Sequence, residues 1–94
     1  MSRSAAPAHS PSRTWRLGEA SIGATGVVAG IQLADDDDDD LERLLLEIGF
    51  VEGAQVSLLH EGPFGRDPIA VRVDDMRVAL RRHEALAVLI RSEP

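Results

Sequence analysis

The 94-residue sequence contains no cysteine, no lysine and only three aromatic residues, Trp15, Phe50 and Phe64. Without cysteine, it has no disulfides, thiolate metal sites, iron–sulfur clusters or cysteine nucleophile. Its core must therefore be built from Leu, Val, Ile and Ala. No apolar run approaches the roughly 18 residues that a membrane span needs, and no apolar signal segment follows Met1. These absences predict a cytoplasmic protein with no direct membrane insertion.

The charges are divided unevenly along the chain. All ten basic residues are arginine, and the formal net charge is −6. Residues 1–16 contain three arginines and no acid, whereas residues 17–94 contain seven arginines and sixteen acids. A domain this acidic repels a phosphate backbone, so we expect no nucleic-acid partner.

The composition divides the chain into a tail and one small domain. Residues 1–14 are rich in Ser, Ala and Pro and show no periodicity, which predicts a disordered N-terminal tail. Residues 15–92 form the expected domain, which is too small for a large enclosed active site.

Short alternating segments after Trp15 predict a mainly β protein. In the first, over residues 25–33, the odd positions Val27, Ala29, Ile31 and Leu33 face one way. Leu17 and Ile22 are expected to anchor the turn before it. Four further strands are expected, over residues 54–60, 69–73, 76–81 and 86–90. Five short strands separated by turns favour a small antiparallel β-barrel, because closure removes exposed edges.

One short α-helix is expected after the first strand. Asp35–Asp40 is a run of six acids that predicts a solvated loop. It is followed by an apolar stripe at i, i+3, i+4 and i+7, formed by Leu41, Leu44, Leu45 and Ile48. Gly49 follows where a left-handed residue commonly ends a helix.

Several segments, taken in order over residues 15–92, resemble the FeoA family (ferrous iron transport protein A), whose members are small SH3-like β-barrels. The matching segments are Leu17–Ala20 with Ile22–Gly23 and Gly26–Val27, then Leu41–Leu44 with Glu47–Gly53, then Val56–Leu58, Gly62–Gly65 and Asp67–Val71, and finally Val78–Ala85. Glu52 stands where the family usually has Pro.

The resemblance implies a cytoplasmic accessory protein of bacterial ferrous iron uptake that binds and modulates a FeoB-type permease. Related domains also occur at the end of iron-dependent repressors. Regulation of a DNA-binding partner is therefore a further hypothesis. The residues themselves indicate no enzyme. The hydroxyls of Ser21, Thr25 and Ser57 have no base–orienter pair nearby in sequence, and Gly23–Gly26 lacks the lysine of a P-loop.

Four apolar residues are candidates for partner binding. Leu46 lies about 100° beyond the core stripe of the helix, and Phe50 and Val51 follow in the next turn. Phe64 is expected at a hairpin tip. Each is also consistent with a scattered surface residue. Arg81 and Arg82 are expected to face solvent.

Direct binding of a transition metal is the alternative function. No cofactor is required, but Fe²⁺ or another divalent transition metal accepts imidazole and carboxylate ligands. The candidate ligands are His60, His83 and Glu84, and Asp35–Asp40 could collect cations weakly. Unpaired edge strands of a short barrel would also permit self-association into a homo-oligomer.

Overall fold

The computed structural model describes residues 13–37 and 39–92. Six strands, two α-helices and one 3₁₀ turn follow one another along this part of the chain. In order they are β2 (Thr14–Arg16), η2 (Leu17–Glu19), β3 (Thr25–Ile31), α1 (Asp39–Ile48), β4 (Gln55–Phe64), β5 (Asp67–Val73), β6 (Met76–Leu80), α2 (Arg82–Ala85) and β7 (Val88–Arg91). Within this part of the chain, no helix is long and apolar enough to cross a membrane.

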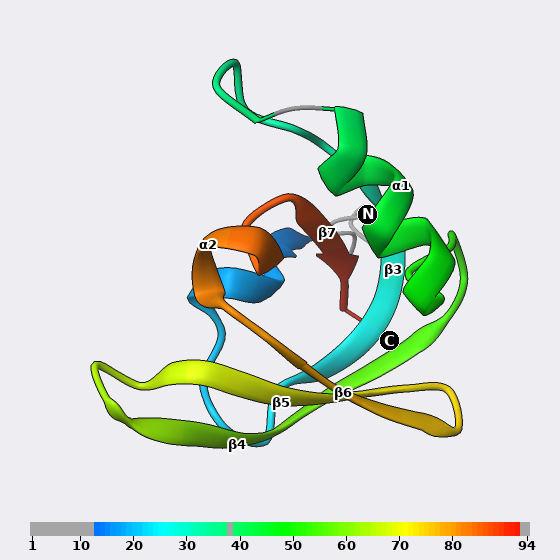
Figure 1. The fold of residues 1–94 in the computed structure, drawn as a ribbon. Coiled ribbons are helices and arrows are strands. Elements are labelled where there is room, and N and C mark those ends of the chain that lie inside the picture. Colours follow the sequence, from blue (N-terminus) through cyan, green and yellow to red (C-terminus); the bar gives the residue numbers. More distant parts are fainter. Residues whose placement is uncertain (1–12, 38, 93–94) are drawn as a thin grey trace, which may run out of the picture.

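The strands form one antiparallel sheet in the order β2-β7-β3-β4-β5-β6. Figure 1 shows this sheet curling around a common interior, with α1 outside and α2 near its open end. The prediction of a mainly β fold with one short helix is thus confirmed. The number of strands was one too low, because β2 pairs with β7 and starts at Thr14. The helix therefore follows the second strand, and residues 1–12 of the expected tail lie outside the described residues.

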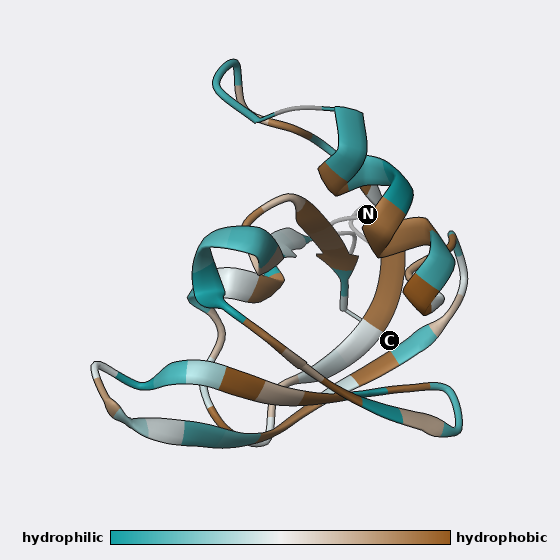
Figure 2. Cartoon of the chain, viewed as in Figure 1, coloured by the Kyte–Doolittle hydropathy of each residue, from teal (hydrophilic) through white to brown (hydrophobic). Residues whose placement is uncertain are grey.

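The core is aliphatic, as the composition requires. Figure 2 shows the hydrophobic residues as bands along the strands and on α1, and the buried ones among them form the core inside the curled sheet. Ile69, Val71 and Val73 of β5 all point inward, as their alternation predicts. The largest fully buried side chain is Phe50, which follows α1. The buried hydrophobic residues are Leu17, Val28, Leu45, Phe50, Ala54, Val56, Leu58, Ile69, Val71, Val73, Leu80, Ala85, Ala87, Val88 and Ile90.

The predicted facing of β3 is wrong in its first half. Val28, an even position, is fully buried, whereas Val27 is only partly buried. The pairing with β7 shifts between Val28 and Gly30, and such a bulge moves the following side chains to the other face. Ile31 and Leu33 pack against the core after the shift. Ile22, the expected anchor, is 56% exposed.

Helix α1 buries a narrower stripe than its sequence predicts. Leu45 is fully buried and Leu41 and Ile48 pack against the core, but Leu44 is 43% exposed. At 100° per residue, Leu44 lies about 65° from the centre of the other three, so it falls at the margin of the contact. Gly49 ends the helix as expected, with φ of 124°.

The β4–β5 hairpin is longer than the breaker residues in its sequence suggest. Pairing continues to Phe64 and Asp67, which flank a two-residue turn. Both turn residues, Gly65 and Arg66, have positive φ (69° and 61°), the combination of a type I′ turn. The hairpin projects from the barrel (Figure 1), and Phe64, which pairs with Asp67 next to the turn, lies near its tip.

Candidate functional site

The outer face of α1 presents one leucine among charged side chains. Leu46 is 43% exposed, and it lines a shallow pocket of about 440 Å³ with Asp39, Glu42, Arg43 and Glu47. Glu42 and Arg43 precede Leu46 by four and three positions, the spacing at which helix side chains are neighbours. Three carboxylates and one guanidinium thus surround an apolar centre. We call these five residues the α1 outer face.

The other apolar candidates lie elsewhere. Val51 is 48% exposed just after the helix, but Phe50 is fully buried. The expectation of an exposed Phe50 is therefore wrong, because the turn after α1, in which the Phe50 N–H bonds the Leu45 carbonyl at 3.0 Å, carries its ring into the core. Leu44 is as exposed as Leu46, yet the two lie about 160° apart around the helix. They form separate spots.

Phe64 forms a second exposed surface. Its side chain is 84% exposed near the tip of the β4–β5 hairpin. In Figure 1 this tip and α1 lie at opposite sides of the molecule, so Phe64 and Leu46 do not belong to one patch.

The two histidines of the domain lie on different elements. His60 is exposed on β4 opposite Ala70. His83, on α2, has its Nε2 atom 3.8 Å from Oδ1 of Asp37. Glu84 is already engaged, since its Oε1 accepts the Arg81 N–H at 3.0 Å. Among residues 13–37 and 39–92, no three His, Asp or Glu side chains gather in a way that could hold a metal ion.

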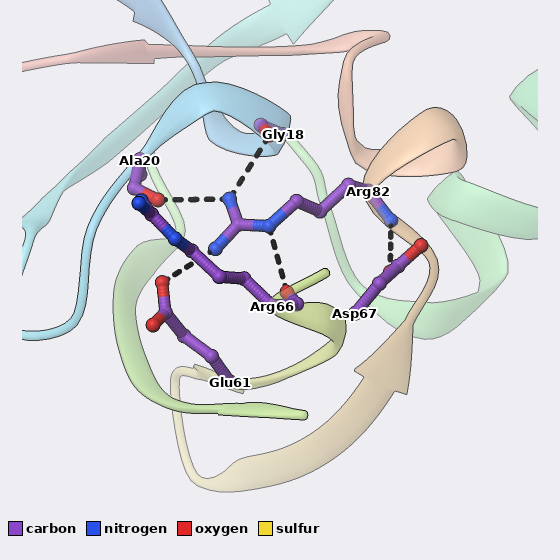
Figure 3. A network of polar contacts seen from close by, with 6 residues as sticks. All are labelled: Gly18, Ala20, Glu61, Arg66, Asp67 and Arg82. Atoms are coloured by element: carbon purple, nitrogen blue, oxygen red, sulfur yellow. Dashed lines mark hydrogen bonds and ion pairs between the residues drawn. The ribbon is translucent and has the colours of Figure 1, made fainter. Parts of the chain in front are cut away.

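Arg82 has a structural role that the sequence did not predict. Its side chain is only 18% exposed, so the expectation that it faces solvent is wrong. Figure 3 shows its guanidinium at the junction of the η2 segment and the β4–β5 hairpin. It donates to the carbonyls of Gly18 (3.1 Å), Ala20 (2.8 Å) and Arg66 (2.8 Å) and pairs with Glu61 at 2.7 Å.

The backbone of Arg82 adds a further link, because its N–H donates to Oδ1 of Asp67 at 2.8 Å. One residue therefore ties α2 to two segments that are distant in sequence. Nothing in the sequence distinguishes Arg82 from its neighbour Arg81, which is exposed. Only the fold assigns them different roles, and the role of Arg82 is to fix the architecture.

A comparison with protein families matches residues 15–92 to the FeoA domain. The chain belongs to the FeoA family. Membership gives it a role in ferrous iron transport, and it confirms the resemblance drawn from the sequence. No curated protein sequence matches the chain.

Solved structures support the same assignment. FeoA from Stenotrophomonas maltophilia, a zinc complex described as a prokaryotic SH3 domain protein and a candidate activating factor of ferrous iron transport, is 36% identical, with a TM-score of 0.69 over 81% of this chain and 88% of that one. A FeoA-like protein from Clostridium acetobutylicum is 27% identical, with a TM-score of 0.73 over 86% and 88%. The barrel is thus an SH3-like fold.

The same fold occurs within a larger regulator. A manganese-dependent transcriptional repressor is 27% identical, with a TM-score of 0.73, over 87% of this chain but only 43% of its own. This FeoA-family chain therefore corresponds to less than half of the repressor.

Proposed function

We propose that this FeoA-family protein is a non-catalytic accessory of ferrous iron uptake that binds the cytoplasmic part of a FeoB-type permease. The α1 outer face is the contact surface, and its occupation modulates transport. The proposal is carried by Leu46, which is 43% exposed and lies within a pocket of charged side chains on the outer face of α1.

The chemistry of this face defines what it would accept. Burying a whole leucine side chain contributes roughly 1.5–3 kcal/mol, and the exposed part of Leu46 would contribute a share of that. Helix α1 carries four acidic residues and one arginine, so a partner surface with basic groups around an apolar pocket would be electrostatically complementary. Complementary charge raises the association rate and selects the partner.

An SH3-like barrel does not by itself specify an activity, because function lies in surfaces added to the fold. Contact is the mechanism most consistent with the way these polar groups are engaged within the fold. Arg82 is committed to backbone carbonyls and Glu61, and Glu84 to a helix cap.

Co-purification with a tagged permease tests the proposal, using a matched pair of leucines on one helix. We expect Leu46→Asp to abolish capture of the permease and Leu44→Asp to retain it, since both leucines are 43% exposed but lie on different flanks. Circular dichroism melts confirm that each variant is folded. Equal capture by Leu46→Asp and the unaltered protein would remove the α1 outer face as the contact.

A further inference from the structure

Strands β4, β5 and β6 present a small apolar pocket on the face of the sheet that points away from the core. His60 lies opposite Ala70, and Ala70 lies opposite Ala79. Because Ile69 and Val71 on either side of Ala70 are buried, side-chain alternation places Ala70 on the outer face. The pocket there has a volume of about 190 Å³ and is lined chiefly by His60, Glu61, Gly62, Pro68, Ala70 and Ala79. We call it the β-face pocket.

Arginines flank the β-face pocket along β5 and β6. Arg72 and Arg77 lie directly opposite each other beside one end of it. Arg81 follows β6 at the other end, and all three arginines are exposed. The one acid of the pocket, Glu61, is already paired with Arg82 at 2.7 Å. An apolar centre therefore lies between positively charged side chains, on a chain whose net charge is −6.

The two facing arginines lack a counter-charge. Like charges directly opposite each other destabilise a sheet. The Arg72 Nε donates to the Asp74 carbonyl at 3.2 Å. Within the part of the chain that the structure describes, Arg77 makes no hydrogen bond, and neither arginine forms an ion pair, even with Asp74 or Asp75 in the adjoining turn. A carboxylate brought to this face would relieve the repulsion between the two guanidinium groups.

The α1 outer face has the complementary chemistry. It surrounds Leu46 with three carboxylates and one guanidinium. A leucine side chain has four carbon atoms, each roughly the size of a water molecule at about 30 Å³, so the β-face pocket has room for it. In Figure 1, α1 lies at the top and β4–β6 form the lower side of the barrel. One chain therefore cannot place its Leu46 in its own pocket.

We propose that the α1 outer face of one copy of this protein docks on the β-face pocket of a second copy. Leu46 enters the pocket, and the acids around it face Arg72 and Arg77. The two surfaces differ, so the contact is heterologous and builds rings or short chains rather than a two-fold dimer. Both surfaces are small, which places the contact in the weak class that buries less than about 1,200 Å².

Self-association would cover the surface that the proposed function assigns to the permease. The permease and a second copy would then compete for the α1 outer face. Only this consequence rests on the proposed function, because the contact between copies is argued from the two surfaces themselves.

Sedimentation velocity on the full chain, from about 10 μM to about 1 mM, covers the range of weak association. We expect the average mass to rise with concentration and to fall as salt is added, because salt screens exposed charges. Ala79→Glu and Leu46→Asp should each weaken association about tenfold or more, since each places a carboxylate in an apolar contact. Leu44→Asp is the matched control and should associate normally. Circular dichroism melts check that each variant is folded.

A mixture of two variants tests the head-to-tail geometry. Leu46→Asp retains the β-face pocket, and Ala79→Glu retains the α1 outer face. We therefore expect the two proteins to form a one-to-one heterodimer when mixed, although each is monomeric alone. An unaltered protein that stays monomeric up to about 1 mM, normal association of Ala79→Glu, or a mixture that stays monomeric would each overturn the proposal.

These experiments contain no permease, so their failure is distinct from failure of the permease contact. Self-association would equally stand if Leu46→Asp still captured the permease. Ala79→Glu separates the two contacts, because it should lose self-association and retain permease capture. Loss of capture by Ala79→Glu, with an unaltered protein that stays monomeric, would show that the β-face pocket binds the permease instead of a second copy.

Discussion

The guanidinium of Arg82 donates to the carbonyl of Gly18 at 3.1 Å, across 64 positions of sequence. The backbone of α2 also lies very close to Gly18. A Cβ at Gly18 would collide with the Arg82 carbonyl and lie 2.7 Å from the Leu86 backbone nitrogen. The junction between η2 and α2 therefore requires a glycine on one side and a long forked cation on the other.

Loss of the Arg82 side chain should destabilise the whole domain. We expect Arg82→Ala to lower the free energy of unfolding by about 2–4 kcal/mol, because Glu61 and three carbonyls lose their donor in a partly buried site. Arg82→Lys should recover only part of this, since an ammonium lacks the planar fork. Arg81→Ala, at the exposed neighbour, is the control and should change it by less than about 0.5 kcal/mol. Urea denaturation measures all three, and equal effects at the two arginines would contradict this role.

Glycine substitutions should separate crowding from backbone strain. Gly18→Ala meets backbone atoms, so we expect a loss of about 2–3 kcal/mol, typical of overpacking. Gly53 has φ of 91° and nothing within 4 Å of an added Cβ, so Gly53→Ala should cost about 1–2 kcal/mol from strain alone.

Asparagine distinguishes the two causes, because it tolerates the left-handed region. Gly53→Asn should therefore be milder than Gly53→Ala, whereas Gly18→Asn should be worse than Gly18→Ala. Thermal melts compare the four variants. If asparagine were milder than alanine at both positions, or more destabilising than alanine at both, a single cause would act at the two glycines.

Regular alternation was the part of the fold that could be predicted. Ile69, Val71 and Val73 keep period 2 in an unbroken strand and face inward as expected. The end of α1 at Gly49 also follows from local chemistry. In β3 the alternation breaks between Val28 and Gly30. The hydrophobic pattern around this bulge looks the same as that of an unbroken alternating strand, so the sequence did not reveal it.

The candidate site was predictable only where it depends on helix geometry. The exposure of Leu46 follows from its angle to the core stripe, whereas the burial of Phe50 depends on how the chain turns after α1. The pairing of Asp37 with His83 joins residues 46 positions apart, so it required the folded chain.

The two phenylalanines of the chain should differ sharply in their effect on stability. Phe50 is fully buried and Phe64 is 84% exposed. We expect Phe50→Ala to lower the free energy of unfolding by about 3–5 kcal/mol and Phe64→Ala to change it by less than about 0.5 kcal/mol. Denaturant titration monitored by circular dichroism measures both. A large loss for Phe64→Ala would mean that the hairpin tip packs against another part of the chain.

The charges around Leu46 should affect permease binding with opposite signs. Glu42 and Arg43 line the same pocket, so a basic partner surface would attract the first and repel the second. We expect Glu42→Gln to weaken binding about two- to fivefold and Arg43→Gln to strengthen it by a similar factor, the scale of single exposed charges. Binding of the unaltered protein should also weaken as salt is raised, because screening shortens the reach of exposed charges. Affinity measured by biolayer interferometry on permease in detergent checks the three trends. Shifts of the same sign for the two variants would rule out a basic partner surface at this face.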